Sequence, residues 1–328
     1  MNAPDRDFAI YLRHTGGPEV LKAEPVMLVA PGLGEVLIRH QAVGLNFHDI
    51  YVRSGSYDRK LPLIPGVEAV GVVEAVGPEV TDFVVGDYVG WIDETYGGYV
   101  TRCIKAAAKL IRIPDSMPPE IAATTLVRGM TVAVLVNGLK HPHAGDTCIV
   151  HAAAGGIGLL LVQWLKHLEV KVVGVVGSPS KIEGARVAGC DVVLWQGGGD
   201  LIKAVEHLSN GRGATVAFDA VGKDTFEESL AALAPGGVLA SFGQSSGPPP
   251  PLMMSTLLPN SLAVWRPALF AHMRTPTERD RLAASFFSAV AEGWLKPADP
   301  TRFALAEADR AHAALESRST TGTIVLLP

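Results

Sequence analysis

The first third of the chain alternates hydrophobic and polar positions in short runs that glycines separate. These runs cover residues 35–40, 66–76, 88–92 and 99–103. Alternation is the pattern of a half-buried β-strand, and several short strands in succession favour an antiparallel arrangement. We therefore expect an antiparallel, barrel-like β-domain from about Phe8 to Pro114.

The pattern changes to helical spacing after Pro118 and Pro119. Apolar residues recur at helical spacing from Glu120 to Leu139, which predicts a helix. From Asp146 onward, β-branched runs alternate with helical patterns. The predicted strands are 147–151, 171–176, 192–194, 215–218 and 238–242, and the predicted helices are 156–168, 181–188, 201–208 and 225–233.

Successive βαβ units of this kind predict a parallel sheet with helices on both faces, which is the doubly wound α/β fold. Ligands of such sheets bind at the carboxyl ends of the strands. The last part of the chain adds a predicted strand at 262–266, helices at 277–293 and 307–318, and a final strand at 322–327.

The composition narrows the possible partners. The chain has 28 Lys and Arg against 33 Asp and Glu, a net charge of −5, which gives no basic footprint for nucleic acid or an anionic membrane. Cys103, Cys148 and Cys190 are too far apart in the sequence for a disulfide framework or a zinc knuckle. Residues 5–7 are charged, unlike a signal peptide, and apolar stretches such as 157–165 are too short to span a bilayer. We expect a soluble cytoplasmic protein.

A small-residue turn follows the predicted strand 147–151. Ala153-x-Gly155-x-x-Gly158 matches the dinucleotide fingerprint with alanine in place of its first glycine. Small residues let the backbone approach a pyrophosphate, whose charge meets the free N–H groups at the start of the following helix. The alternative is a turn that serves only close packing of helix on sheet. The expected cofactor-binding residues are Ala154, Gly155, Gly156, Ile157 and Gly158.

The residues after the predicted strand 171–176 indicate whether the cofactor is NAD or NADP. An NAD site places an Asp or Glu about 20 residues beyond the glycines, to hold the ribose diol. The sequence Gly174-Val-Val-Gly177-Ser178 has no acid there, whereas Ser178 and Lys181 offer a hydroxyl and an ammonium for a 2′-phosphate. This pattern predicts NADP(H), unless Lys181 only solvates a helix.

The chain lacks the usual groups that stabilise a developing alkoxide. No cysteine has further ligands at metal spacing, and the close pair His141-x-His143 flanks Pro142 in a predicted loop. Tyr57 and Lys60 come nearest to a Tyr-x-x-x-Lys pair, one residue short. We therefore expect an acceptor that is easy to reduce, a quinone or a conjugated carbonyl, whose reduction leaves a delocalised anion.

One motif points to a different chemistry. Gly243-x-Ser245-x-Gly247 matches the nucleophile elbow of hydrolases, which needs a helix directly after the serine. Residues 248–251 are all proline, and proline cannot continue a helix interior. We interpret this segment as a loop at a strand end, over the nicotinamide.

Several stretches together resemble a known family. They are His14-Thr-Gly-Gly-Pro-Glu-Val-Leu21, Gly44-Leu-Asn-Phe-His-Asp-Ile-Tyr-Val-Arg-Ser-Gly55, His151 to Gly158, Phe242-Gly-Gln-Ser-Ser-Gly247, Arg310-Ala-His312 and Glu316-Ser-Arg318. The chain resembles the quinone oxidoreductase (zeta-crystallin-like) branch of the zinc-independent medium-chain dehydrogenase/reductases, and the likeness spans nearly its whole length.

The resemblance implies a GroES-like barrel catalytic domain and a Rossmann cofactor domain. The catalytic domain would comprise residues 1–125 completed by 267–328, and the cofactor domain residues 126–266. The resemblance also implies NADPH as cofactor and a homodimer. Zinc-dependent relatives carry a cysteine at Asn46 and a histidine at Val67, so both zinc ligands are replaced here. No metal is expected.

The resemblance also implies roles for single residues. Asn46 and Thr131 would lie beside the nicotinamide, Tyr51 near the substrate carbonyl, and Tyr57 in the substrate cleft. Arg266 would steady the developing oxyanion or the cofactor. From the residues alone, each tyrosine is equally a core ring whose hydroxyl bonds the backbone, and Arg266 a surface ion pair. Asp49 is expected to hold the turn after Asn46.

The remaining implied residues bind the cofactor. Ser178, Lys181 and Arg318 match the family's 2′-phosphate grip, and Gln196 stands where close relatives have a tyrosine, which predicts a weaker preference for NADPH. Trp195 would replace that ring only if its strand shifted register. The other expected cofactor contacts are Gly177, Val221, Phe242, Gln244 and Ser245.

These inferences predict an NADPH-dependent quinone reductase that works by proximity and orientation, with a proton from Tyr51 or water. Two alternatives stay open. One is an enone, alkenal or enoyl reductase of the same fold, and the other is a protein that binds NADPH without turnover.

Overall fold

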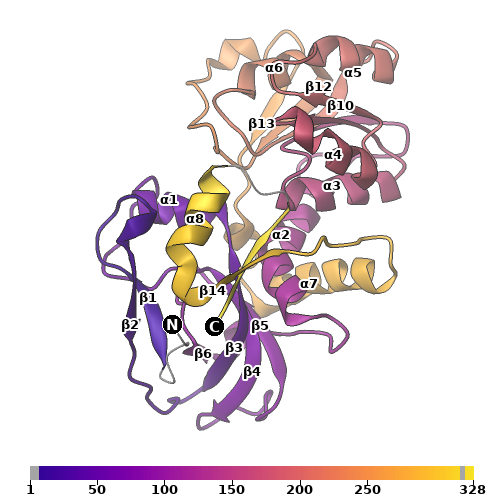
Figure 1. The fold of residues 1–328 in the computed structure, drawn as a ribbon. Coiled ribbons are helices and arrows are strands. Elements are labelled where there is room, and N and C mark those ends of the chain that lie inside the picture. The colour runs from indigo at the N-terminus through magenta and orange to yellow at the C-terminus, as the bar shows by residue number, and fades with distance from the viewer. Residues whose placement is uncertain (1–6, 318–321) are drawn as a thin grey trace. The chain divides into compact units, whose positions relative to one another are not determined.

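The computed structural model describes residues 7–317 and 322–328, which pack as two compact units (Figure 1). The first unit runs to Val127 and takes in Thr275–Ala283 and the described residues of Ala298–Pro328. The second unit comprises Arg128–Arg274 and Ala284–Pro297. The sequence analysis predicts a catalytic domain of residues 1–125 and 267–328 and a cofactor domain of residues 126–266. The limits of these two domains stay predictions.

A seven-stranded, largely antiparallel sheet forms the first unit, in the order β14-β15-β3-β4-β5-β7 with β6 beside β3. Its strands are β3 (Glu35–Leu45), β4 (Glu68–Val76), β5 (Tyr88–Ile92), β6 (Arg102–Ala106), β7 (Leu110–Arg112), β14 (Thr301–Ala304) and β15 (Ile324–Leu327). One edge of β3 is shared, since residues 35–39 pair with β6 and residues 43–45 pair with β15. The end of the chain therefore completes the sheet that its beginning starts.

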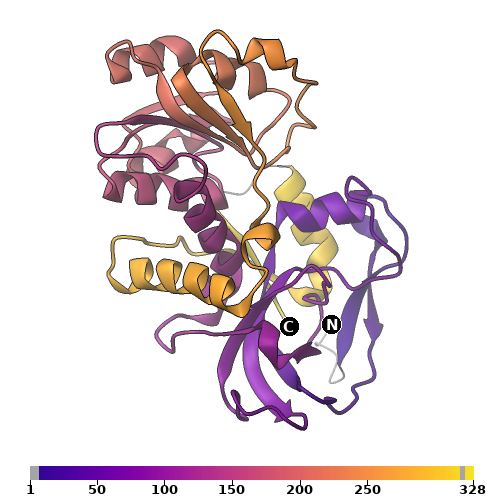
Figure 2. The ribbon, with the colours of Figure 1, turned by 180° about the vertical axis from the view of Figure 1, so that it is seen from behind.

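This sheet curls because the pairing of β3 with β4 is irregular. Its register shifts between Leu37 and Ile38 and again between His40 and Ala42, and such bulges bend a strand. Gly71 permits the close approach, since a Cβ there would lie 2.0 Å from the carbonyl oxygen of Arg39. Figure 2 shows the bent strands from behind.

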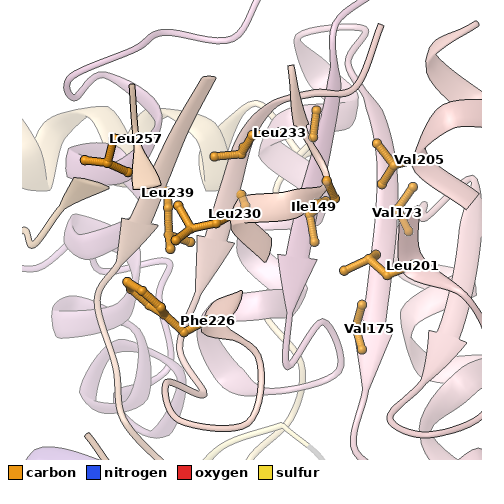
Figure 3. Packing of buried hydrophobic residues seen from close by; sticks show 13 residues of the cluster. Ile149, Val173, Val175, Leu201, Val205, Phe226, Leu230, Leu233, Leu239 and Leu257 are labelled. Atoms are coloured by element: carbon orange, nitrogen blue, oxygen red, sulfur yellow. The ribbon is translucent and has the colours of Figure 1, made fainter. Parts of the chain in front are cut away.

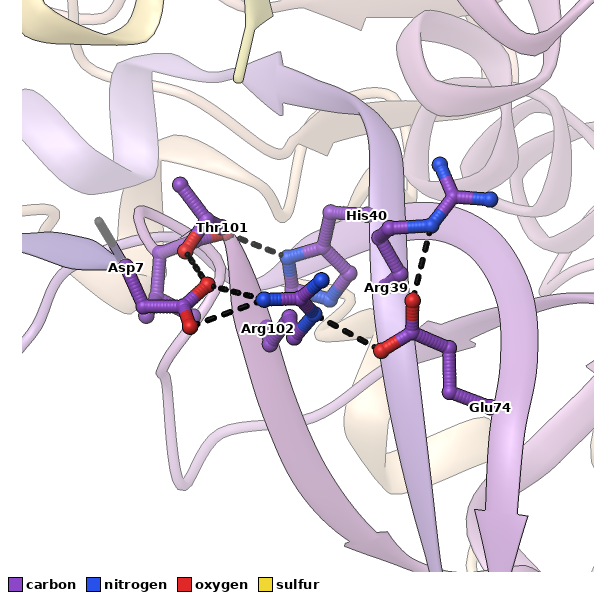
Figure 4. A network of polar contacts seen from close by, with 7 residues as sticks. Asp7, Arg39, His40, Glu74, Thr101 and Arg102 are labelled. Atoms are coloured by element: carbon purple, nitrogen blue, oxygen red, sulfur yellow. Dashed lines mark hydrogen bonds and ion pairs between the residues drawn. The ribbon is translucent and has the colours of Figure 1, made fainter. Parts of the chain in front are cut away.

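A polar network joins four segments of the first unit, namely β3, β4, the start of β6 and Asp7 (Figure 4). Arg102 on β6 donates to both carboxylate oxygens of Asp7 and, through Nε, to Glu74 on β4 (2.7 Å). The other oxygen of Glu74 accepts from Arg39 on β3 (2.9 Å), and Thr101 donates to Asp7. Because these groups are partly exposed, the network fixes strand order more than it adds stability.

One predicted strand of the first unit starts later than expected. The predicted strand 99–103 begins at Arg102 instead, because Tyr99 and Val100 bond to β1 (Phe8–Leu12) and its neighbours. β1 pairs with β2 (Leu21–Pro25) in a separate hairpin. Short 3-10 helices cover Pro18–Val20, Ala107–Lys109, Pro179–Lys181, Met254–Thr256, Leu269–His272 and Leu305–Glu307.

The second unit contains a six-stranded parallel sheet in the order β10-β9-β8-β11-β12-β13. The strands are β8 (Thr147–His151), β9 (Lys171–Val176), β10 (Val192–Trp195), β11 (Ala214–Asp219), β12 (Leu233–Ser241) and β13 (Ala263–Trp265). The helices between them are α3 (Gly156–His167), α4 (Ile182–Ala188), α5 (Leu201–Ser209) and α6 (Phe226–Ala231). This order confirms the predicted doubly wound fold.

The core between the sheet and helices α5 and α6 explains why these segments pack as they do (Figure 3). Alternate residues of β8 and β9 face these helices, whose apolar residues recur at helical spacing. The cluster includes Ile149, Val173, Val175, Leu201, Val205, Phe226, Leu230, Leu233, Leu239 and Leu257, all buried. Truncating one of the large members to alanine would cost about 2–5 kcal/mol.

Three further helices are α2 (Pro119–Val136), α7 (Pro276–Ala291) and α8 (Ala308–Glu316). In the described part of the chain, only α2 has the length and apolar composition of a membrane span, and 72% of that window is buried inside the fold. A buried apolar helix is typical of the core of a soluble protein. Gly129 on α2 makes room for Phe286 on α7, whose ring a Cβ would overlap at 2.3 Å.

Two buried histidines of the first unit are neutral. Burial lowers the pKa of His40 to about 4 and, with Arg53, that of His312 to about 3. Nε2 of His40 accepts from the Trp91 indole (3.1 Å), so its Nδ1–H donates to the carbonyl of Val100 (2.8 Å). Protonation of either ring would break such bonds.

We expect the free energy of unfolding to fall as the pH is lowered from about 6.5 to about 5. The folded-state pKa values of His40 and His312 lie below the ordinary 6.5, so only the unfolded chain binds these protons, at a cost of about 2 kcal/mol per histidine by pH 5. Urea unfolding at several pH values measures the slope. His40→Gln and His312→Gln should each make it shallower, and an unchanged slope in both would contradict the assignment.

Candidate functional site

The carboxyl ends of the six parallel strands form one edge of the second unit. Helices leave this edge towards opposite faces between β8 and β11, the switch point at which doubly wound sheets bind ligands. The structure brings to this edge nearly all the predicted cofactor residues of the second unit. They are Ala154, Gly155, Gly156, Ile157, Gly158, Gly177, Ser178, Lys181, Gln196, Val221, Phe242, Gln244 and Ser245.

The small-residue turn after β8 has the geometry that a pyrophosphate requires. Ala152 has a positive φ of 52°, and the N–H of Gly155 closes the turn on its carbonyl (2.8 Å). α3 begins directly afterwards, so the N–H groups of its first turn have no acceptor within the helix. Gly158 is required, because a Cβ there would lie 2.2 Å from the carbonyl oxygen of Ala152. The turn both packs closely and presents donors.

The loops after β11 and β12 are bonded to each other. Ser246 donates to the carbonyl of Val221 through its N–H (2.9 Å) and its hydroxyl (2.8 Å), and Ser245 N–H donates to Ala220 (3.3 Å). Gly222 has a φ of +90°, a conformation that favours glycine. The predicted contacts Val221, Gln244 and Ser245 therefore belong to one double loop.

The structure does not form a nucleophile elbow at Ser245. The segment from Phe242 to Met253 contains no helix, although the motif needs one directly after the serine. The hydrolase alternative is therefore excluded by the backbone, as the prolines predict.

Arg266, directly after β13, is bonded to the loop that follows β12. Its guanidinium donates to the carbonyl and hydroxyl of Ser241 (3.2 and 3.1 Å), to the carbonyl of Gly243 (3.2 Å) and to Oε1 of Gln244 (3.0 Å). No described carboxylate forms an ion pair with it. The geometry thus gives Arg266 a loop-holding contact that the sequence analysis did not anticipate.

Hydroxyl and ammonium groups follow β9, where an NAD site would have an acid. Ser178 Oγ lies 2.9 Å from Ser180 Oγ, and Lys181 ends the short helix Pro179–Lys181 before α4. Ser180 was not predicted, although its position two residues after Ser178 signals a second hydroxyl. Gln196 directly follows β10, the strand beside β9, and its N–H donates to the carbonyl of Val176 (2.9 Å). Arg318 lies outside the described residues.

A buried carboxylate at the end of β11 organises the switch point. Oδ1 of Asp219 accepts from the N–H groups of Val221 (2.7 Å) and Gly222 (3.2 Å) and from the hydroxyl of Thr225 (2.9 Å). Its side chain is fully buried. This carboxylate fixes both the loop after β11 and the start of α6, and the sequence analysis missed it.

His151, a buried histidine at the end of β8, is bonded to Ser229 on α6. Ser229 donates its hydroxyl proton to the carbonyl of Thr225 (2.7 Å), so its oxygen accepts from Nε2–H of His151 (2.8 Å). Burial lowers the pKa of His151, against the opposing effect of Asp219, so the ring is neutral. Nδ1 of His151 and Oδ2 of Asp219 have no hydrogen-bond partner in the structure.

The first unit holds the predicted residues Asn46, Tyr51 and Tyr57. Asn46 caps α1 (Phe47–Ser54), a helix that was not predicted, and its N–H donates to Oδ2 of Asp49 (2.9 Å). The expected structural role of Asp49 is thus confirmed. Gly55 ends the helix at a φ of 84°.

Glu68 orients the Asn46 amide. Nδ2 of Asn46 donates to Oε1 of Glu68 (2.7 Å), and Oε2 accepts from the N–H of Val127 (2.8 Å). A carboxylate only accepts, so the amide oxygen of Asn46 must face the other way. Glu68, fully buried, was missed as a functional residue, although it directly follows Gly66-Val67 in the family motif.

Tyr51 and Tyr57 are half-buried, with ring centroids 5.1 Å apart. They are therefore not enclosed core rings. Thr131, on α2 in the second unit, is also half-buried. Among the described residues, no three His, Cys, Asp or Glu side chains are grouped as a metal centre requires. His141 instead bonds the carbonyl of Val136 through Nδ1 (2.8 Å).

Comparison with known proteins identifies both parts of the chain. Residues 32–117 match the model of the alcohol dehydrogenase GroES-like domain, and residues 156–284 match that of the zinc-binding dehydrogenase family. A quinone oxidoreductase of Pseudomonas aeruginosa is 41% identical over 98% of both chains. The chain belongs to the quinone oxidoreductase branch of the medium-chain dehydrogenase/reductases. The predicted GroES-like and Rossmann folds are thereby confirmed.

Two other relatives show the range of this family. The structure of Escherichia coli quinone oxidoreductase complexed with NADPH is 35% identical, with a TM-score of 0.93 over 98% of this chain and 100% of that one. A 2-haloacrylate reductase of Burkholderia sp is 36% identical over 98% of both chains. The chain is therefore an oxidoreductase of this family, whose members act on more than one class of acceptor.

We expect Thr225→Val to destabilise the second unit by about 1.5–3 kcal/mol, because it removes a hydrogen bond to the buried Asp219 carboxylate. Thr225→Ser keeps the hydroxyl and should cost clearly less. Tryptophan fluorescence during urea unfolding measures both, since Trp164, Trp195, Trp265 and Trp294 all lie in the second unit. Equal losses in the two variants would show that the bond contributes nothing.

Proposed function

We propose that this protein is an NADPH-dependent quinone reductase. One arrangement carries the proposal: a phosphate-binding turn at the switch point, followed at the next strand end by Ser178, Ser180 and Lys181 in place of an acid. Relatives named quinone oxidoreductase, one of them solved with NADPH, support the same reaction.

The residues of the second unit fit NADPH. The N–H groups of Gly156, Ile157 and Gly158 would bind the pyrophosphate, since Gly158 admits the close backbone approach that it requires. Ser178, Ser180 and Lys181 would hold the 2′-phosphate, together with Arg318. Phe242 and the double loop with Val221, Gln244 and Ser245 would border the nicotinamide half. When bound, NADPH supplies the hydride.

The chain's own residues bind and orient. Glu68 holds the Asn46 amide so that its oxygen is free to accept from a ribose hydroxyl. Arg266 holds Gln244 and the carbonyl of Gly243 in place, which fixes the loop beside the cofactor. Tyr51 would donate the proton to the reduced acceptor, or else water would. A quinone needs no stronger electrophile, because its reduced anion is delocalised.

The second candidate function is reduction of an activated alkene. The 36% identical 2-haloacrylate reductase favours it specifically, because that relative is named for an unsaturated acid instead of a quinone. The fold and the cofactor site would serve both reactions.

A cytoplasmic location and a homodimer stay predictions. Sedimentation velocity tests whether the protein is a dimer.

An absorbance assay at the NADPH band separates these functions. We expect rapid NADPH oxidation with 1,4-benzoquinone and 9,10-phenanthrenequinone and slow oxidation with 2-chloroacrylate, short enals and enoyl thioesters. Faster turnover of an alkene would establish the second candidate. Stoichiometric NADPH binding without oxidation by any acceptor would indicate a non-catalytic binding protein.

We expect Lys181→Ala to raise the KM for NADPH about 10- to 100-fold, because a charge-assisted bond to the 2′-phosphate is lost. The KM for NADH, which lacks this phosphate, should change little. Lys203→Ala on α5, an exposed lysine paired with Asp200, is the matched control. Equal effects of Lys181→Ala on both cofactors would remove the phosphate role.

A further inference from the structure

Aromatic rings gather around α1 on the first unit. The Tyr51 and Tyr57 rings lie 5.1 Å apart between centroids, and the His48 ring lies 5.3 Å from Tyr57 and 5.9 Å from Tyr96. These residues come from α1 and from the loops that follow α1 and β5. We call His48, Tyr51, Tyr57 and Tyr96, together with Arg59, the aromatic cluster. It is larger than the pair of tyrosines that the sequence analysis singled out.

Arg59 brings one exposed positive charge to this cluster. Its Nε donates to the hydroxyl of Tyr96 (2.6 Å), one NH1 hydrogen goes to the carbonyl of Asp58 (2.9 Å), and its Cζ lies 5.8 Å from the Tyr96 ring centroid. The remaining guanidinium N–H groups have no acceptor among the described residues. No described carboxylate, including the nearby Asp58 and Glu94, forms an ion pair with it. The guanidinium is thus anchored at one side and available at the other.

Tyr96, which anchors Arg59, is held in an unusual backbone conformation. Its φ is +62°, which costs a non-glycine residue about 1 kcal/mol or more. Lys105, itself buried, donates to the carbonyl of Tyr96 and keeps this conformation. The side chain of Tyr96 is only 5% exposed although its hydroxyl is bonded to an exposed arginine. In this conformation the Tyr96 hydroxyl accepts from the Arg59 guanidinium.

The rest of the cluster carries no charge. The Tyr96 oxygen accepts from Arg59, so its proton is free to go to Nε2 of His48 (3.2 Å), which requires that nitrogen to be unprotonated. Burial and the nearby Arg59 lower the pKa of His48 to about 4. Burial also raises the pKa of Tyr96 above its ordinary value. At neutral pH the rings of His48, Tyr51, Tyr57 and Tyr96 carry no charge, and the exposed Arg59 lies beside them.

Tyr51 and Tyr57 are already expected beside the acceptor; we propose that Arg59, next to these rings, makes the site select planar aromatic quinones that bear an anionic substituent. The rings of Tyr51 and Tyr57 contact the planar face of the quinone, and the available side of Arg59 binds a carboxylate or sulfonate on it. This inference rests on the proposed quinone reductase function and adds the charge of the substrate. Arg59 becomes a specificity-determining residue.

The experiment compares two quinones that differ in charge but little in shape: 9,10-phenanthrenequinone-2-carboxylate and its methyl ester. The measured quantity is the ratio of kcat/KM for the carboxylate to kcat/KM for the ester. Arg59→Gln should lower this ratio about three- to tenfold, as expected for the loss of one charge-assisted contact at a partly exposed position. Arg59→Lys should retain part of the preference, because it keeps the charge without the planar fork.

Lys22→Gln is the matched control, since Lys22 is an exposed lysine on β2 of the same unit and its loss changes the net charge equally. It should leave the ratio unchanged. Raising the salt concentration to about 0.5 M should lower the ratio of the wild type towards that of Arg59→Gln, because salt screens exposed charges. Equal ratios in the wild type and Arg59→Gln would overturn the proposal.

A binding measurement separates this proposal from the proposed function. Phenanthrene-2-carboxylate cannot be reduced as a quinone, and titration calorimetry compares its affinity with that of phenanthrene-2-carboxamide. Tighter binding of the carboxylate, lost in Arg59→Gln, would support the anionic site even if no quinone oxidised NADPH, in which case only the proposed reaction would fail. Rapid turnover of the neutral ester with equal affinity for both phenanthrenes would sustain the reaction and refute the role of Arg59.

Discussion

A carboxylate taken out of water must be met by donors, and Asp219 is where the second unit meets this requirement. Two backbone N–H groups and one hydroxyl converge on a single oxygen, and those donors belong to the loop after β11 and to the residue that begins α6. The loop after β12 then bonds to the carbonyls of this first loop. The loop after β11, the start of α6 and, through that loop, the loop after β12 are thus tied to this one carboxylate.

The first unit contains a comparable arrangement around a cation. Arg53, 2% exposed, donates to both oxygens of Glu316 on α8 and to the carbonyl of Gly16, and Nδ1 of His312 lies 3.5 Å from it. Tyr99 bonds to the other nitrogen of His312 (2.9 Å). Because Arg53 lies on α1, this network ties the helix of Asn46 and Tyr51 to a helix that ends just before Arg318 in the sequence. Positions far apart in the chain are thereby held at fixed spacing within one unit.

The sequence predicts the second unit well because the patterns of its strands and of its helices are both clear. Buried parallel strands are continuous β-branched runs, and the helices between them carry an apolar face, so each element was recognised near its place. The start of β12 at Leu233 was missed, because Pro235-Gly236-Gly237 interrupts its pattern. The turn at Gly155 and Gly158 was found because only small residues permit its close approach.

The sequence does not predict contacts that depend on an unusual backbone conformation, or contacts between residues far apart in the chain. α1 was missed because its short, mixed sequence shows no clear period, although Asn46-x-x-Asp49 and Gly55 are helix-end signals. The bond from Arg59 to Tyr96 spans 37 residues and depends on the positive φ of Tyr96, which no local pattern reveals. The same holds for Glu68 and Asn46, which are 22 residues apart.

The shared edge of β3 has a consequence for how the chain folds as it is made. The ribosome releases residues 43–45 much earlier than β15, so this part of the β3 edge has no partner while the residues between them are synthesised. An open strand edge is a template for pairing between chains. The second unit, nearly continuous in sequence, is able to fold first, whereas the sheet of the first unit closes only after β15 has emerged.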